Sequence, residues 1–136
     1  MKIIITLDDR GGMAFNKRRQ SRDIAVSADI EALVGENTLF IEPYSAELFS
    51  EASLNIILSQ EPERLAEEDD YIFLETRSPE AAIAQANEIV IYKWNRRYPF
   101  DVSLNFSPEP LGFKLKSTHD FKGNSHEKIT REVYVK

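Results

Sequence analysis

The sequence contains no cysteine and only two histidines among its 136 residues. The absence of cysteine excludes disulfides and thiolate metal sites, and two histidines are too few for a histidine-rich metal centre. No apolar run approaches the roughly 20 residues that a membrane-spanning helix needs. The apolar stretch at the N-terminus is too short for a signal peptide, and charged residues follow it at once. We therefore expect no metal, no membrane segment and a cytoplasmic location.

The charge that is present is unevenly distributed along the chain. The formal net charge is −6. Residues 36–87 carry twelve acidic and two basic side chains, whereas the rest of the chain carries eleven acidic and fifteen basic ones. A net acidic chain is a poor general nucleic-acid binder, because neutralising phosphates requires a basic surface. The local exception is the basic stretch that contains Lys17, Arg18, Arg19 and Arg22.

The length fits a single domain spanning residues 1–136, and 42% hydrophobic residues predict a packed core. Strands are predicted at 1–8, 38–41, 54–58, 71–74, 88–93 and 101–106, helices at 22–34, 46–50 and 79–86, and a closing hairpin at 113–121 and 127–135. Strands that alternate with helices predict parallel pairing, since parallel neighbours need crossover connections. The expected fold class is α/β, a three-layer α/β/α arrangement with a mixed, mainly parallel sheet and a C-terminal antiparallel hairpin.

Three local features are also predicted. Residues 9–20 contain Gly11-Gly12 and are expected to form a long loop. Ser21 is expected to cap the first helix, and Asp23 to lie in its first turn. His126 is expected to be exposed in the hairpin loop. Neighbouring residues on a strand point to opposite faces, so His126 is expected to form no triad with its sequence neighbours.

Several segments, in this order, resemble the dihydrofolate reductase family. IIITLDDRGGMAFN is similar to that family's first strand and mobile loop, and TLFIEPYSAELF to its strand, turn and short helix. SLNIILSQEPE resembles its N-I-I/V-L-S strand, SPEAAIA resembles a capped helix, and the tail GFKLKSTHDFKGNSHEKITREVYVK resembles its closing hairpin. The resemblance implies the dihydrofolate reductase fold over most of the chain.

The departures from that family concern its cofactor and substrate sites. The Gly-Arg turn that faces the 2′-phosphate of NADPH is matched by Glu42-Pro43, which brings a negative charge and removes an N–H. The strand that ends in a double glycine, with its pyrophosphate-binding helix, has no counterpart before the strand at Glu88. The arginine that holds the folate tail is matched by Ser53. We therefore expect no cofactor and no NADPH-dependent reduction.

The family also uses a buried acid on its first helix to hold and protonate the pterin. The segment SADI resembles the family's P-x-D-L and points to Asp29, whereas an ungapped count from Asn16 points to Asp23, so both are candidate catalytic acids. The segments DDRGGM, WNRRYP and SHEKIT resemble small bacterial proteins of uncertain role that are sometimes labelled ribonuclease Z. That label is not supported, because the enzyme class holds two zinc ions with an H-x-H-x-D-H cluster.

The basic stretch is the candidate ligand site. Its expected ligand-binding side chains are Arg10, Arg18, Arg19 and Arg22. Arginine forks grip phosphate or carboxylate, and α/β sheets bind ligands at loops that follow their strands. Tyr44 directly follows a strand, and Trp94 opens a segment of aromatic and basic residues, so both are candidates for contact with the ligand, Trp94 by stacking.

Two functions follow from these residues. The first is a binding module for a small anionic ligand, nucleotide-like or pterin-like, at the basic loop 10–22. The alternative is an enzyme with a reorganised site, of hydrolase or nuclease type, that uses Asp23 or Asp29. The chain is expected to be a monomer or a homodimer paired through an edge strand.

Overall fold

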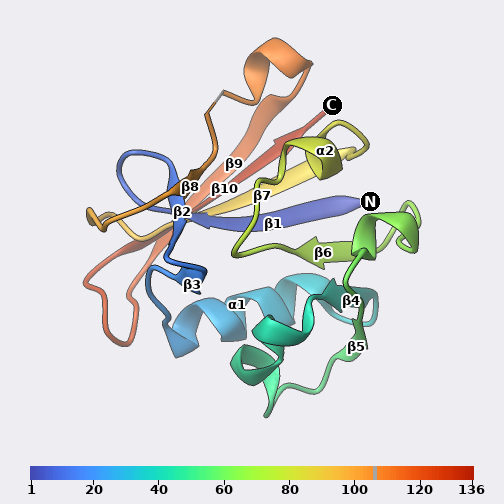
Figure 1. Cartoon of the computed structure of the whole chain (residues 1–136), viewed down its shortest axis with the longest axis horizontal. Helices are drawn as coiled ribbons and strands as arrows, with labels where there is room; N and C mark the ends of the chain where they lie inside the picture. Colours follow the sequence, from blue (N-terminus) through green and yellow to red (C-terminus); the bar gives the residue numbers. More distant parts are fainter. Residues whose placement is uncertain (106) are drawn as a thin grey trace.

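The computed structural model describes residues 1–105 and 107–136, which form one large sheet and one small sheet. The large sheet has the strand order β5-β4-β6-β1-β7-β10-β9 (Figure 1). Its strands are β1 (Lys2–Leu7), β4 (Thr38–Ile41), β5 (Asn55–Leu58), β6 (Tyr71–Phe73), β7 (Glu88–Lys93), β9 (Lys114–Phe121) and β10 (Ile129–Val135). The strands β5, β4, β6, β1 and β7 are parallel, and β10 pairs antiparallel with both β7 and β9. The predicted mixed sheet with its C-terminal hairpin is confirmed.

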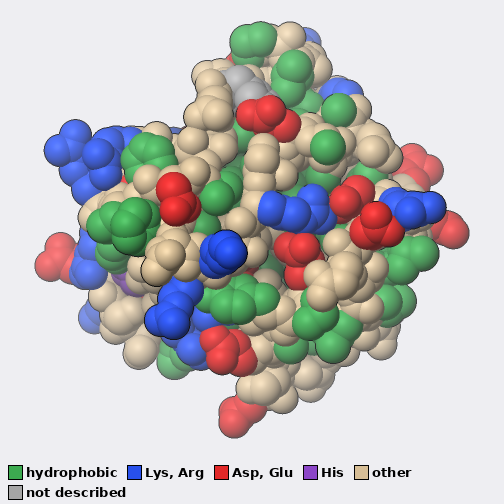
Figure 2. All heavy atoms as spheres, viewed as in Figure 1, with side chains coloured by type: hydrophobic (Ala, Val, Ile, Leu, Met, Phe, Trp, Pro, Cys, Tyr) green, Lys and Arg blue, Asp and Glu red, His purple; other side chains and the backbone are tan. Residues whose placement is uncertain are grey.

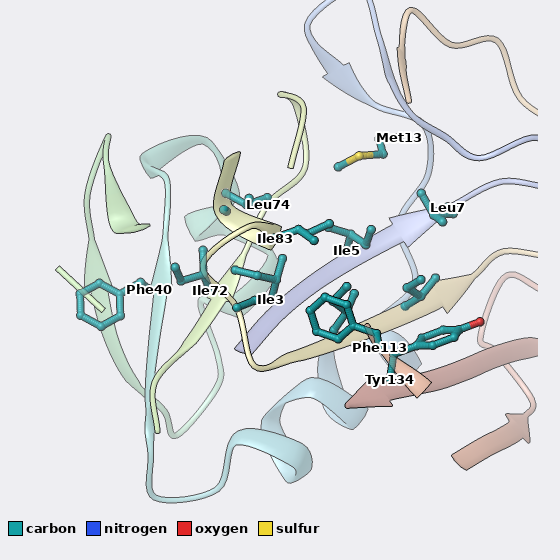
Figure 3. Packing of buried hydrophobic residues seen from close by; sticks show 14 residues of the cluster. Ile3, Ile5, Leu7, Met13, Phe40, Ile72, Leu74, Ile83, Phe113 and Tyr134 are labelled. Carbon is teal, nitrogen blue, oxygen red and sulfur yellow. The ribbon is translucent and has the colours of Figure 1, made fainter. Parts of the chain in front are cut away.

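The sheet is covered on both faces. Helix α1 (Ile24–Val34) and the 3-10 segment η1 (Pro43–Phe49) pack on one face, and the one-turn helix α2 (Glu80–Ile83) packs on the other. Successive side chains of a strand point to opposite faces, so Ile4 packs in the cluster with α1. Ile3 and Ile5 pack in the cluster with α2 (Figure 3). The three-layer prediction is confirmed, with an α2 that is shorter than the predicted helix 79–86.

The segment predicted as a long loop contains a β-hairpin instead. Strands β2 (Gly12–Phe15) and β3 (Arg18–Arg19) pair antiparallel, and β2 also pairs with β8 (Val102–Ser103) in the small sheet. The turn residues Asn16 and Lys17 have φ values of 52° and 63°, and two consecutive positive φ values are what a tight hairpin requires. Of the strand predicted at 101–106, only the two residues of β8 form a strand, and residue 106 lies outside the described residues.

The first helix begins at a different cap from the one predicted. Asp23, not Ser21, is the N-cap, with extended backbone and a carboxylate that accepts a hydrogen bond from the Ala25 amide at 2.8 Å. Buried side chains at Val26, Ile30 and Val34 repeat every fourth residue, which is the helical spacing for a face against the sheet. Within the described ranges, no helix has the length and apolar character needed to cross a bilayer.

The topology has one switch point, where the connections from two neighbouring strands leave in opposite directions. The chain leaves β1 through α1 and joins the sheet again at β4, on the far side of β6. It leaves β6 through α2 and crosses β1 to reach β7. In open α/β sheets, ligands bind in the crevice outside the carboxyl ends of the strands at such a point. The carboxyl ends of β1 and β6 are therefore where a site is expected.

Candidate functional site

The crevice at the switch point is almost filled by side chains. The cavity left between α1, η1 and the ends of β1 and β6 has a volume of about 10 Å³. Polar residues in its lining include Thr6, Ser21, Asp23 and Glu75, and Trp94 also lines it. A space of this size holds about one water molecule. The described structure therefore has a closed crevice here, too small for a flat ring system.

A buried ion pair helps to close it. The Glu75 side chain, which is 4% exposed, accepts hydrogen bonds from Arg19 Nε at 2.8 Å and from Ser45 Oγ at 2.7 Å. The Arg19 guanidinium also pairs with Glu47 and lies 4.4 Å from the centre of the Tyr44 ring. Burial alone would lower the pKa of Arg19, but the hydrogen bonds and the charge of Glu75 raise it, so the guanidinium stays charged. Two of the predicted ligand-binding residues, Arg19 and Tyr44, lie together, and the Arg19 guanidinium is occupied by carboxylates of the chain itself.

Asp23 connects the start of α1 to the turn between β9 and β10. Its carboxylate accepts hydrogen bonds from the backbone amides of Ala25, Asn124 and Ser125 at 2.8–2.9 Å, and one from the ring of His126. Burial raises the pKa of Asp23, but these hydrogen bonds outweigh burial and hold it well below its ordinary value. At Gly123 an added Cβ would lie 2.5 Å from Asp23 Oδ2, so the turn needs a glycine to approach this closely.

His126 is buried, contrary to the prediction that it is exposed. It is 4% exposed, and Trp94 stacks on its ring with the ring centres 4.7 Å apart. Its Nδ1 lies 2.9 Å from Asp23 Oδ2, and its Nε2 lies 3.1 Å from Ser21 Oγ and 3.0 Å from the Tyr98 hydroxyl. The prediction considered only the sequence neighbours of His126, whereas its partners come from two distant segments. The small residues of the turn, which permit close approach, were the only sequence signal for this packing.

The other candidate acid, Asp29, lies away from the cavity. Its Oδ2 accepts hydrogen bonds from the Tyr92 hydroxyl at 2.6 Å and from Arg131 Nη1 at 2.7 Å. Burial, reinforced by Asp29, raises the pKa of Tyr92. Asp29 therefore links α1 to β7 and β10, while Asp23 contributes to the cavity lining.

The remaining predicted arginines are exposed, and Arg22 also lines the cavity. Arg10 lies 5.0 Å from the centre of the Phe100 ring and donates a hydrogen bond to the Tyr98 carbonyl. Arg18 is exposed on β3, and the Arg22 side chain is 56% exposed, 3.7 Å from Glu47. Trp94, predicted to stack on a ligand, is 3% exposed and stacks on His126 instead.

Three loops meet at this end of the sheet, and we call residues 8–23, 94–101 and 122–128 the basic end. Hydrogen bonds connect them, among them Asp9 N to the Arg96 carbonyl, Arg10 to the Tyr98 carbonyl and Arg96 to the Ser125 carbonyl. The three loops together contain nine Lys or Arg and five Asp or Glu, whereas the whole chain has a net charge of −6. Figure 2 shows Lys and Arg side chains over the β2–β3 end of the molecule. The positive charge of the chain is therefore concentrated where the switch point lies.

A three-layer sheet of this topology, with its crevice outside β1 and β6, defines a recognisable fold class. No protein-family model and no curated protein matches the sequence. Among solved structures, the chain is similar to the dihydrofolate reductase from Enterococcus faecalis complexed with NADP(H) and RAB-propyl. The TM-score is 0.67 at 12% sequence identity, and the alignment covers 98% of this chain and 94% of that chain. The predicted dihydrofolate reductase fold is confirmed, and at this identity the similarity concerns the fold alone.

Proposed function

We propose that the basic end binds a small, phosphate-bearing ligand of the nucleotide-like class. The observation that carries this proposal is the charge: a net +4 in the three loops, nine basic against five acidic residues, on a chain whose total is −6. Two of those five acids, Asp8 and Asp23, are buried and occupied by hydrogen bonds within the chain. The exposed surface is therefore even more positive than the count.

Exposed aromatic rings beside the arginines favour a nucleotide over a simple anion. Phe15 is 48% exposed, and its strand partner in the β2–β3 hairpin is Arg18. Tyr44 is 40% exposed and lies against Arg19. A base can stack on such a ring while the exposed arginines Arg18 and Arg22 hold the phosphate as forks, with the phosphate replacing Glu47 as the partner of Arg22. Binding of this kind takes place on the surface and does not need the closed crevice to open.

We also infer that the chain is not an NADPH-dependent reductase. A βα unit does stand at the switch point, β6 followed by α2, but its connection, residues 74–79, reads LETRSP and contains no glycine. A diphosphate needs free backbone amides at a helix start and glycine for close approach. Here the connection carries the buried carboxylate of Glu75, and α2 is a single turn. The cavity of about 10 Å³ also leaves no room for a nicotinamide beside a pterin.

The proposal is tested by thermal unfolding in the presence of ADP as the probe. At 100 times its Kd, a ligand raises the free energy of unfolding by about 2.7 kcal/mol. Replacing both arginines in R18A/R22A removes two charge-assisted contacts of about 1.5 kcal/mol each, which is roughly a hundred-fold in Kd. Raising the salt concentration is also expected to weaken binding.

The matched control is K114A/K116A, which removes the same charge from exposed positions on the edge strand β9. The proposal requires the control to bind ADP like the native chain. Equal weakening in both double variants, or no stabilisation by ADP at millimolar concentration, contradicts it. Oxidation of NADPH with dihydrofolate, followed by absorbance, tests the second inference, and turnover would refute it.

The alternative function, an enzyme with a reorganised site, is supported for Asp23 and not for Asp29. Asp29 has no contact with the cavity, and its Oδ2 is occupied by Tyr92 and Arg131. Asp23 is bonded to a buried histidine whose other nitrogen contacts a serine hydroxyl. Asp23, this histidine and this serine therefore form a candidate catalytic arrangement.

A further inference from the structure

Ser21, His126 and Asp23 are arranged as a nucleophile, a base and the group that orients the base. Ser21 Oγ is 3.1 Å from His126 Nε2, and His126 Nδ1 is 2.9 Å from Asp23 Oδ2. Both distances are within the hydrogen-bond reach of about 2.6–3.2 Å that activates a serine hydroxyl. Such a constellation is recognised by geometry and roles, and the order of its residues in the sequence differs between folds.

The surroundings fix the proton on the ring nitrogen that this chemistry requires. An ionised carboxylate can only accept hydrogen bonds, so His126 Nδ1 must donate to Asp23. The pKa of Asp23 is lowered by its backbone hydrogen bonds, which keeps the carboxylate ionised. In the neutral ring the lone pair is then on Nε2, which faces the hydroxyl groups of Ser21 and Tyr98.

Burial holds this geometry rigid. The side chains of His126 and Asp23 are 2% and 0% exposed, and Trp94 stacks on the imidazole. The Tyr98 hydroxyl donates to Ser21 Oγ at 3.3 Å, which keeps the serine oxygen beside the ring. Ser21 itself is only half-buried and lines the cavity. The imidazole is thus buried, whereas Ser21 is partly exposed.

We propose that Ser21 is a nucleophile, that His126 is its general base and that Asp23 positions the imidazole, so that the chain hydrolyses small carboxylic esters. This activity goes beyond ligand binding at the basic end, since it uses a neutral substrate and residues other than the arginines. The catalytic residues are Ser21 and His126, and Asp23 is a positioning residue.

The reaction balances without any further reactant except water. Ser21 Oγ attacks the ester carbonyl carbon while its proton moves to His126 Nε2. The tetrahedral adduct collapses, the carbon–alkoxide bond breaks, and the alcohol leaves with the proton from Nε2. Water then attacks the acyl-serine, Nε2 takes its proton, and the acid is released as Ser21 regains a proton from the ring.

Two further features belong to the residues that line this cavity: a buried indole N–H and an apolar wall. Trp94 Nε1 is buried without a hydrogen-bond partner in the described part of the chain, and a buried donor of this kind needs an acceptor. Trp94 and Ser21 line the same cavity. Val26, Ile30 and Phe73 form the apolar part of the lining. Because the volume of about 10 Å³ holds no acyl group, a short ester is expected to reach the half-buried Ser21 from the surface.

Hydrolysis of p-nitrophenyl acetate, together with labelling by a fluorophosphonate, tests the proposal. The native chain is expected to release p-nitrophenol with turnover and to form a covalent adduct that peptide mass analysis locates at Ser21. S21A is expected to lose both, with roughly a 10³-fold decrease in kcat. The matched control S117A replaces an exposed serine on β9 that does not line the cavity, and it is expected to keep both activities.

The positioning role of Asp23 has its own readout. D23N is expected to lower kcat and the labelling rate while KM changes little, because the substrate does not contact the carboxylate. Should D23N fail to fold, the comparison of S21A with S117A still decides the proposal. Absence of labelling at Ser21 in the folded native chain, or equal hydrolysis by S21A and the native chain, overturns it. Loss of ADP binding bears only on the exposed arginines and not on Ser21 or His126, so the two proposals fail separately.

Discussion

Replacing Asp23 by asparagine tests how the turn between β9 and β10 is held. Asparagine keeps one acceptor oxygen, which serves the amides of Ala25 and Asn124 as Asp23 Oδ1 does. It places an amino group where Oδ2 accepts from the Ser125 amide and from His126 Nδ1. One donor then faces another, and the helix cap is preserved, so the change isolates the contacts of Oδ2.

The magnitude follows from those contacts. A hydrogen bond to a charged group contributes about 1.5–3 kcal/mol, and His126 can recover part of the loss by changing tautomer. We expect D23N to lower the free energy of unfolding by about 2–4 kcal/mol, a large fraction of the 5–15 kcal/mol that is typical of native proteins. In urea unfolding, the urea concentration at the midpoint should fall, while the slope of the unfolding free energy against urea concentration stays constant.

The control is D9N, which removes an equal charge from an exposed loop position. A surface change of this kind is expected to stay within about 0.5 kcal/mol of the native chain. If D23N also stays within that range, the turn is not held by this carboxylate, and the account of His126 burial is wrong.

Three further predictions concern the same end of the molecule. G123A is expected to lose about 1–3 kcal/mol of stability, measured by urea unfolding, because its Cβ would lie 2.8 Å from the His126 carbonyl as well as against Asp23; native-like stability would show that the turn has room. R19Q should cost about 3–5 kcal/mol by leaving Glu75 buried and unpaired, and a melting temperature unchanged from the native chain would contradict that. Because the pKa of Asp23 is lowered on folding from 3.8, its contribution is complete above about pH 4 and is lost as the pH falls further; D23N should therefore show a shallower decrease in stability between pH 4 and pH 2, and parallel profiles would refute this.

The fold was predictable because its signals are local. Continuous apolar runs in β1 and β7, and the helical spacing of buried residues in α1, decide these elements without reference to the rest of the chain. The β2–β3 hairpin was missed because its turn is Asn16-Lys17, and lysine gives no sign that it takes a positive φ. The types of these elements could therefore be predicted from the sequence, whereas the unusual turn could not.

The site was less predictable because its contacts are long-range. Arg19 was expected to bind a ligand, but it pairs with Glu75, and that contact depends on how β6 ends beside η1. His126 and Asp23 are separated by 103 residues in sequence, so no spacing rule brings them together. Burial of the histidine follows from packing of the β9–β10 turn against the start of α1, which only the three-dimensional structure shows.

The most direct test of the proposed function is a map of where ADP binds. In two-dimensional ¹H–¹⁵N spectra of the labelled chain, titration with ADP should shift amide resonances in residues 8–23, 94–101 and 122–128, with saturation. The largest changes are expected near Arg18 and Arg22, whose side chains are exposed and face no buried carboxylate. An unchanged spectrum at millimolar ADP, or shifts confined to the acidic segment 36–87, would contradict the central claim.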